Sequence, residues 1–155
     1  MTFTVLLLAI SIGIIAGLRA MTAPAAASWA ARLGSLNLGP TSLAFLGYAF
    51  TPWIFTALAL GELVTDQLPS TPSRTVPLQF GTRILTGALS GGAIGAAHGQ
   101  LVAGVVWGAI GAVIGTLGGR AARARLAASF GRDQPAALLE DAVAIGGAFL
   151  IMWAA

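Results

Sequence analysis

The chain contains no cysteine, no lysine and few charged residues of either sign. Without cysteine it has no disulfide, no thiolate nucleophile and no cysteine-ligated metal site. Charged residues make up 8% of the sequence, whereas soluble domains carry about 25%. Hydrophobic residues make up 57%, and the mean hydropathy is +0.88. Because so few polar side chains cannot cover a surface in water, we expect one integral membrane domain over residues 1–155, surrounded by membrane lipids.

The sequence also lacks the motifs of common enzymes and metal sites. It has no P-loop, no nucleophile elbow and no zinc-protease helix, and its single histidine, His98, has no second metal ligand nearby. Glu140 and Asp141 are adjacent, so on a helix they point about 100° apart, and we expect them to stabilise a helix N-terminus and pair with nearby arginines. We therefore predict no enzyme activity, no cofactor and no metal, and a membrane enzyme acting on lipid phosphates stays open as an alternative.

Apolar runs predict an all-α bundle of about five transmembrane helices. The runs span residues 3–30, 42–63, 78–97, 100–118 and 137–154, each near the length of about 20 residues that crosses a bilayer. The first run is too long for one straight crossing, so we expect a kink, or a break into two half-helices, near Pro24.

The basic residues are all arginine, and they indicate an orientation. The formal net charge is +3 and the pI about 11.2, which in a soluble protein would suggest nucleic acid. In an apolar chain the arginines are better explained as topology signals, so we predict no nucleic-acid partner. They gather in the connection at residues 119–136, and Arg74 lies in the connection at 64–77. With five spans, the positive-inside rule predicts a cytoplasmic N-terminus and an external C-terminus.

Arg19 is the most informative single residue because it lies inside the first apolar run with no acidic neighbour. A charge at the middle of a membrane helix costs about 2.5–3.5 kcal/mol on insertion scales, so it needs a partner or a task. Pairing with Glu62 or Asp66 in a dry core would favour a structural role. A wet cavity shared with Thr22 and the break at Pro24 would favour a binding role.

The polar centre of the chain is the segment GELVTDQLPSTPSRTVPLQFGTR. Glu62 and Asp66 are four residues apart and share a helix face, and prolines and hydroxyls, including Ser73, precede Arg74 and Arg83. One interpretation is an ordered connection held by ion pairs such as Glu62 with Arg83. The other is a site that binds or gates a substrate.

Glycines at four-residue spacing predict close packing of the third and fourth spans as a glycine-zipper hairpin. Arg83 continues this stripe, so we expect its side chain to point into the bundle. The residues that we assign to helix packing are Gly87, Gly91, Gly95, Gly99, Gly104, Gly108, Gly111 and Gly115.

Three segments, GLRAMTAPAAASWAA, LPSTPSRTVPLQFGTRILTGALSGGAIGA and LLEDAVAIGGAFLI, carry a family resemblance. The chain resembles an uncharacterised group of small bacterial integral membrane proteins, usually labelled as a domain of unknown function, and the resemblance covers most of the chain. It implies residence in the bacterial inner membrane but no established activity. It also implies importance for Arg19, Thr22, Pro24, Glu62, Asp66, Pro69, Pro72, Ser73, Arg74 and Arg83.

Two functions follow from the chemistry of these side chains. The first is a small transporter, channel or translocator for an anionic or phosphate-bearing solute or lipid headgroup, because arginine binds oxyanions bidentately. We expect it to work as a homodimer or higher homo-oligomer, with the glycine faces as candidate contacts. The second is a non-transporting membrane scaffold whose buried charges are structural. The residues that we assign to substrate binding or gating are Arg19, Thr22, Pro24, Ser28, Glu62, Asp66, Ser73, Arg74 and Arg83.

Overall fold

The computed structural model describes residues 2–66 and 75–155. Every regular element in these residues is a helix, which confirms the all-α class. The elements are α1 (Phe3–Leu18), α2 (Thr22–Leu33), the 3-10 helix η1 (Ala44–Gly47), α3 (Thr51–Thr65), α4 (Pro77–Ala97), α5 (Leu101–Phe130) and α6 (Asp133–Ala154). Within the described residues, α5 and α6 are the two helices long and apolar enough to cross a membrane, and α1 and α3 are shorter apolar helices. The five-span bundle is therefore not confirmed.

The second half of the chain forms two long helices whose ends differ from the prediction. α5 continues to Phe130, well past the expected end at 118, and stops where Gly131 adopts a left-handed φ of 68°. α6 then begins at Asp133, earlier than the expected 137. Polar arginines extend α5 because they are good helix formers, so the apolar run marks only part of the helix.

α4 and α5 pack backbone to backbone through glycine. A Cβ atom at Gly91 would lie 2.5 Å from the carbonyl oxygen of Gly104, and a Cβ at Gly95 would lie 2.5 Å from that of Gln100. Such spacing is possible only where side chains are absent. Gly99 is not part of this contact: it forms the turn with a φ of 68°, and a Cβ atom added there would meet no atom within 4 Å.

The remaining glycines predicted for the hairpin instead pack against α1. Gly111 approaches the carbonyl of Ile10, and Gly115 approaches that of Ile14, so α1 runs parallel to α5. On α1 itself, Gly13 and Gly17 complete the contact against α5. These glycine faces are thus occupied within one chain, and they are not free for the contacts between copies that the sequence suggested.

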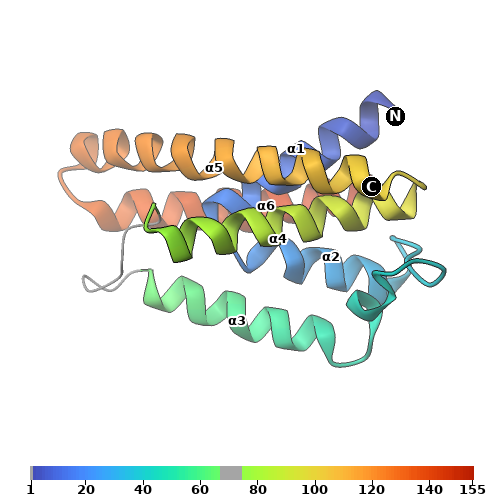
Figure 1. Cartoon of the computed structure of the whole chain (residues 1–155). Helices are drawn as coiled ribbons and strands as arrows, with labels where there is room; N and C mark the ends of the chain where they lie inside the picture. Colours follow the sequence, from blue (N-terminus) through green and yellow to red (C-terminus); the bar gives the residue numbers. More distant parts are fainter. Residues whose placement is uncertain (1, 67–74) are drawn as a thin grey trace.

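The first apolar run is two helices, and the second returns toward the end from which the first came (Figure 1). The break lies at residues 19–21, before Pro24, which occupies the first turn of α2. Proline fits there because the first N–H groups of a helix have no intrahelical acceptor. Both termini consequently lie at the same end of the molecule (Figure 1), which differs from the predicted placement at opposite ends.

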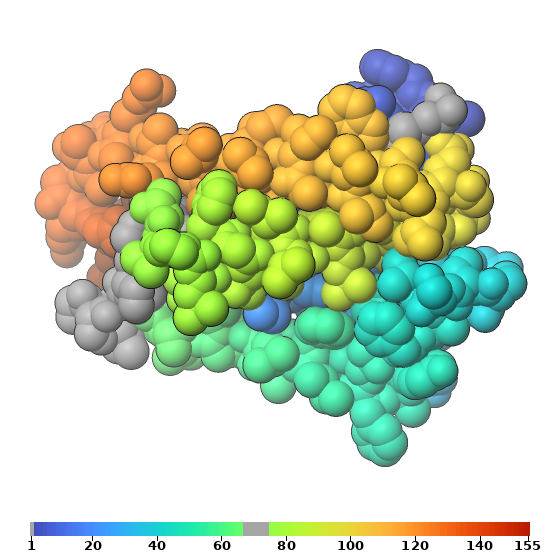
Figure 2. Space-filling model, in the orientation of Figure 1, coloured from blue at the N-terminus to red at the C-terminus, as the bar shows by residue number. Residues whose placement is uncertain are grey.

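α3 lies at the edge of the bundle and covers α2 (Figure 1). It starts at Thr51, later than the span predicted from residue 42, and Pro52 is its buried residue. In the space-filling view, α3 and α4 form the visible surface on either side of a seam, with α2 behind it (Figure 2). α3 is the least embedded of the long helices.

Buried arginines and exposed large apolar side chains occur together in this structure. Arg19 and Arg83 head the largest fully buried side chains, whereas Leu78 is 79% exposed and Trp153 is 82% exposed. Half of the buried residues in the apolar core between the helices are alanine, and the other half are larger side chains such as Ile12 and Ile94. Two arginines therefore lie inside the bundle, while many large apolar side chains face outward.

Candidate functional site

The candidate site forms around the break between α1 and α2. α1 ends because Arg19 adopts an extended backbone (φ −139°, ψ 108°), although its N–H still bonds to the carbonyl of Ile15. Two helix ends therefore meet inside the protein. The end of α1 presents free carbonyl groups with partial negative charge, and the start of α2 presents free N–H groups with partial positive charge.

A carboxylate from α3 satisfies the N–H groups of the break. The backbone N–H groups of Ala20 and Met21 donate to the two oxygens of Glu62, each at 2.8 Å. The two bonds fix both oxygens, and the negative charge lies where the start of α2 favours an anion.

A guanidinium from α4 satisfies the carbonyl groups of the break. Arg83 Nη1 donates to the carbonyl oxygens of Gly17 at 2.9 Å and Leu18 at 2.7 Å. Its Nη2 lies 3.5 Å from Glu62 Oε1 and 3.9 Å from Asp66 Oδ2, so the predicted pair of Glu62 with Arg83 is present. Each helix end is thus met by a side chain of opposite charge.

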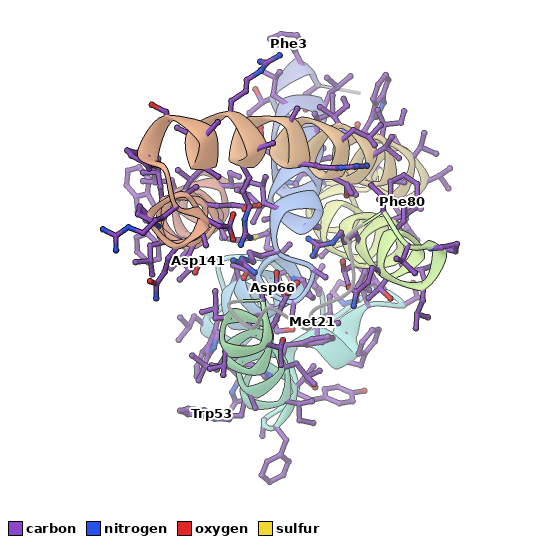
Figure 3. All side chains as sticks on the ribbon, turned by 90° about the vertical axis from the view of Figure 1, so that its left-hand side faces the viewer. Phe3, Met21, Trp53, Asp66, Phe80 and Asp141 are labelled. Atoms are coloured by element: carbon purple, nitrogen blue, oxygen red, sulfur yellow. The ribbon has the colours of Figure 1, made fainter. Side chains whose placement is uncertain are left out.

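Arg19 lies at the break itself and is completely buried. Its guanidinium pairs with Asp66, the C-cap residue of α3, and with Asp141 from α6. Figure 3 shows Asp66, Asp141 and Met21 gathered near the centre of the bundle, viewed from the end where α5 turns into α6. We call these side chains the break cluster: Arg19, Glu62, Asp66, Arg83 and Asp141.

A second ion-pair group lies beside the break cluster. Arg123 bonds to Asp133 through Nε at 3.0 Å and Nη2 at 2.6 Å, and its Nη1 lies 3.5 Å from Glu140. Arg123 lies in the last part of α5, beyond the first ~20 residues that suffice to cross a bilayer. The hydrogen bond to Asp133 raises the pKa of its guanidinium above the ordinary value. Together the two groups contain all five acidic side chains of the sequence.

The other predicted site residues have different environments. Thr22 starts α2 and lines an apolar pocket of about 540 Å³ between α2 and α6. Trp29, Phe149 and Trp153 also line this pocket. Ser28 is completely buried, and its hydroxyl has no hydrogen-bond partner among the described residues. Pro24 is buried in the first turn of α2. Ser73 and Arg74 lie outside the described residues.

Asp141 is the member of the break cluster that the sequence alone did not assign to the site. We expected Glu140 and Asp141 together to pair with the arginine-rich connection. Glu140 does contact Arg123, but Asp141 points to Arg19 instead. The angle of about 100° between neighbouring helix residues was the available signal, because it directs the two carboxylates to different partners.

Within residues 2–66 and 75–155, no group of three or more His, Asp or Glu side chains is arranged to hold a metal ion. What the break cluster offers chemically is a pair of backbone N–H donors, two guanidinium groups and three carboxylates in a buried setting. Such a setting suits oxyanion binding or proton exchange, because ionic contacts strengthen away from water.

No family model, no curated protein and no solved structure matches this chain. The break cluster and the surface around it are therefore the basis for the function proposed below.

Proposed function

We propose that the chain is a multi-pass protein of the bacterial inner membrane. Its exposed apolar side chains and buried arginines support this proposal, because lipid accommodates the first and the protein interior must satisfy the second. With the arginines of α5 at the cytoplasmic side, both termini face outward. This orientation replaces the one expected from five spans, because α1 and α2 lead into the bundle and back out again.

Within the membrane, the protein translocates a small anionic or phosphate-bearing solute through the break cluster. The observation that carries this proposal is the Glu62 carboxylate held by the N–H groups of Ala20 and Met21. Interrupted helices in transporters present free N–H groups to anionic substrates near the middle of the membrane. In this chain the Glu62 carboxylate occupies the place of such a substrate, and a transported anion would replace it at the N–H groups of Ala20 and Met21. A homodimer or higher oligomer is also part of the proposal.

A non-transporting membrane scaffold is the second candidate, and one observation favours it. Arg19 is fully buried and pairs with two carboxylates, which is the outcome expected of a structural charge. In that case the break cluster would serve only to hold a folded-back helix in place.

Flux measurements with the purified chain in liposomes separate the two functions. Vesicles loaded with inorganic phosphate, acetate or chloride are diluted, and release of each anion is followed with and without a proton gradient. The transport proposal predicts release of at least one anion above that of protein-free vesicles. It also predicts loss of release in Arg83→Gln and retention in Arg125→Gln, which alters an exposed arginine away from the cluster. Absence of release for all three, with protein that is folded and inserted, would favour the scaffold.

A further inference from the structure

α3 is attached to the protein by few apolar contacts. Pro52 is its buried residue, and Trp53, Leu60 and Val64 are each more than half exposed. The first half of α3 contacts Trp29 of α2. The indole N–H of Trp29 donates to the hydroxyl of Thr56 at 3.0 Å, and the ring centroids of Trp29 and Trp53 lie 5.0 Å apart, edge to face. Elements with little buried apolar surface are the ones that open at low free-energy cost.

The charged attachments of α3 lie at its other end. Glu62 accepts two backbone N–H bonds and faces Arg83, while Asp66 pairs with Arg19. Hydrogen bonds to ionised groups are about twice as strong as neutral ones, so protonation of the two carboxylates removes much of what holds this end.

We propose that α3 is a gate over the break cluster and that protonation of Glu62 and Asp66 opens it. The charged groups that face the pair are Arg19 at the break, Arg83 from α4 and Arg123 from α5, whose charge also acts on Asp66. Asp141 from α6 pairs with Arg19. This inference rests on the proposed function, because it states how access to the same site is regulated.

The open state keeps partners for both arginines. Arg19 retains Asp141, and Arg83 retains the carbonyl groups of Gly17 and Leu18. The cost of leaving a buried charge unpaired is thereby avoided when α3 moves away. The N–H groups of Ala20 and Met21 become the uncovered donors, so proton uptake by α3 frees the oxyanion position.

The absence of cysteine allows a direct distance measurement in the full chain. Spin labels at Leu60→Cys on α3 and Leu85→Cys on α4 use side chains that are 58% and 71% exposed. In liposomes, the distance between them is expected to lengthen by at least about 5 Å, one helical turn, when the pH falls from about 7.5 to about 3, below the ordinary range in which carboxylates ionise. The double variant Glu62→Gln with Asp66→Asn is expected to show the longer distance already at the higher pH.

Two controls keep the result interpretable. Asp133→Asn neutralises an exposed carboxylate of the second ion-pair group and is expected to leave the distance unchanged. Labels at Leu85→Cys and Ile114→Cys report the glycine-packed pair α4 and α5, whose distance is expected to stay constant under every condition. That constancy shows that the double variant is folded.

Three outcomes would overturn the gate. The first is a distance from α3 to α4 that is insensitive both to pH and to the double variant. The second is a response to pH that the double variant does not reproduce, because a group other than Glu62 and Asp66 would then be responsible. The third is an equal change between α4 and α5, which would report loss of the whole fold. The liposome assay of anion release tests the proposed transport function separately, whichever of these distances is observed.

Discussion

Two regions of this protein are held together in opposite ways. α1, α4 and α5 meet through glycine with almost no space between their backbones, as at Gly91 against Gly104. α3 instead depends on Glu62 and Asp66 at one end and on Trp29 at the other. Close packing tolerates no displacement, whereas charge pairs change with protonation or with a competing ion. The comparison indicates that the glycine-packed region is the frame and α3 is the part that moves.

The largest effect on stability is expected from removing Arg19, which lies at the centre of the break cluster. Arg19→Ala leaves Asp66 and Asp141 facing each other without their shared partner. Removing one member of a buried ion pair costs about 3–5 kcal/mol, so we expect a loss of this size in the free energy of unfolding. Denaturant titration in detergent measures it. Arg125→Ala, on an exposed position of α5, serves as the control, and an equal loss there would contradict the assignment.

The next largest effect is expected from a substitution in the glycine-packed contact of α4 with α5. Gly108→Ala places a methyl group against the carbonyl of Gly87, and neither backbone can move without separating α4 from α5. Overpacking of this kind costs about 1–3 kcal/mol. Gly146→Ala on α6, with no atom within 4 Å of an added Cβ, is expected to be neutral or slightly stabilising in the same thermal unfolding assay. Similar melting temperatures for the two variants would show that the glycine contact is not tight.

A smaller effect is expected from Glu62→Gln. The glutamine amide can accept from one backbone N–H but presents its own NH₂ to the other, so one of the two bonds to Ala20 and Met21 is lost. We expect a loss of about 1–3 kcal/mol, measured by denaturant titration. Asp133→Asn is the matched control on an exposed pair. Faster hydrogen exchange at Met21 but not on α5 would localise the change to the break.

The smallest effect comes from Thr56→Val, which removes the acceptor for the indole N–H of Trp29. The expected loss is about 1 kcal/mol, and the intrinsic fluorescence of the tryptophans should shift as the ring contact with Trp53 loosens. Thr82→Val is the control, because that hydroxyl bonds to Leu78 of its own helix. A larger change in Thr82→Val would mean that the fluorescence reports something other than the attachment of α3.

The sequence predicted the parts of this structure that depend on local patterns. Apolar runs marked the helices, the spacing of Gly87, Gly91 and Gly95 marked the contact of α4 with α5, and the spacing of Glu62 and Asp66 placed both on one face. Each signal lies within a few residues, where helical periodicity decides geometry. The pair of Glu62 with Arg83 also followed, because both belong to one short polar segment.

What could not be predicted depends on how distant segments come together. The fold-back of α2 follows from contacts made by Glu62 and Arg83, and Pro24 drew attention to a position just after the true break. The pairing of Asp141 with Arg19 joins the two ends of the chain. The angle between neighbouring helix residues separates Asp141 from Glu140, but it does not reveal which distant arginine each carboxylate meets. The number of spans was not confirmed for the same reason, since an apolar run reveals length but not direction.

The measurement that tests the central claim most directly is thiol accessibility at the break. Thr22→Cys is placed in the cysteine-free chain, with Ala9→Cys in the fully buried part of α1 as the control, and a membrane-impermeant reagent is added from each side. We predict labelling of Thr22→Cys from one side only. The rate should rise at least about tenfold, the equivalent of about 1.4 kcal/mol, when Glu62→Gln and Asp66→Asn are added. Ala9→Cys should stay unlabelled. If Thr22→Cys is also unlabelled in both backgrounds while the protein remains folded, the break cluster is a sealed structural core and the transport proposal is contradicted.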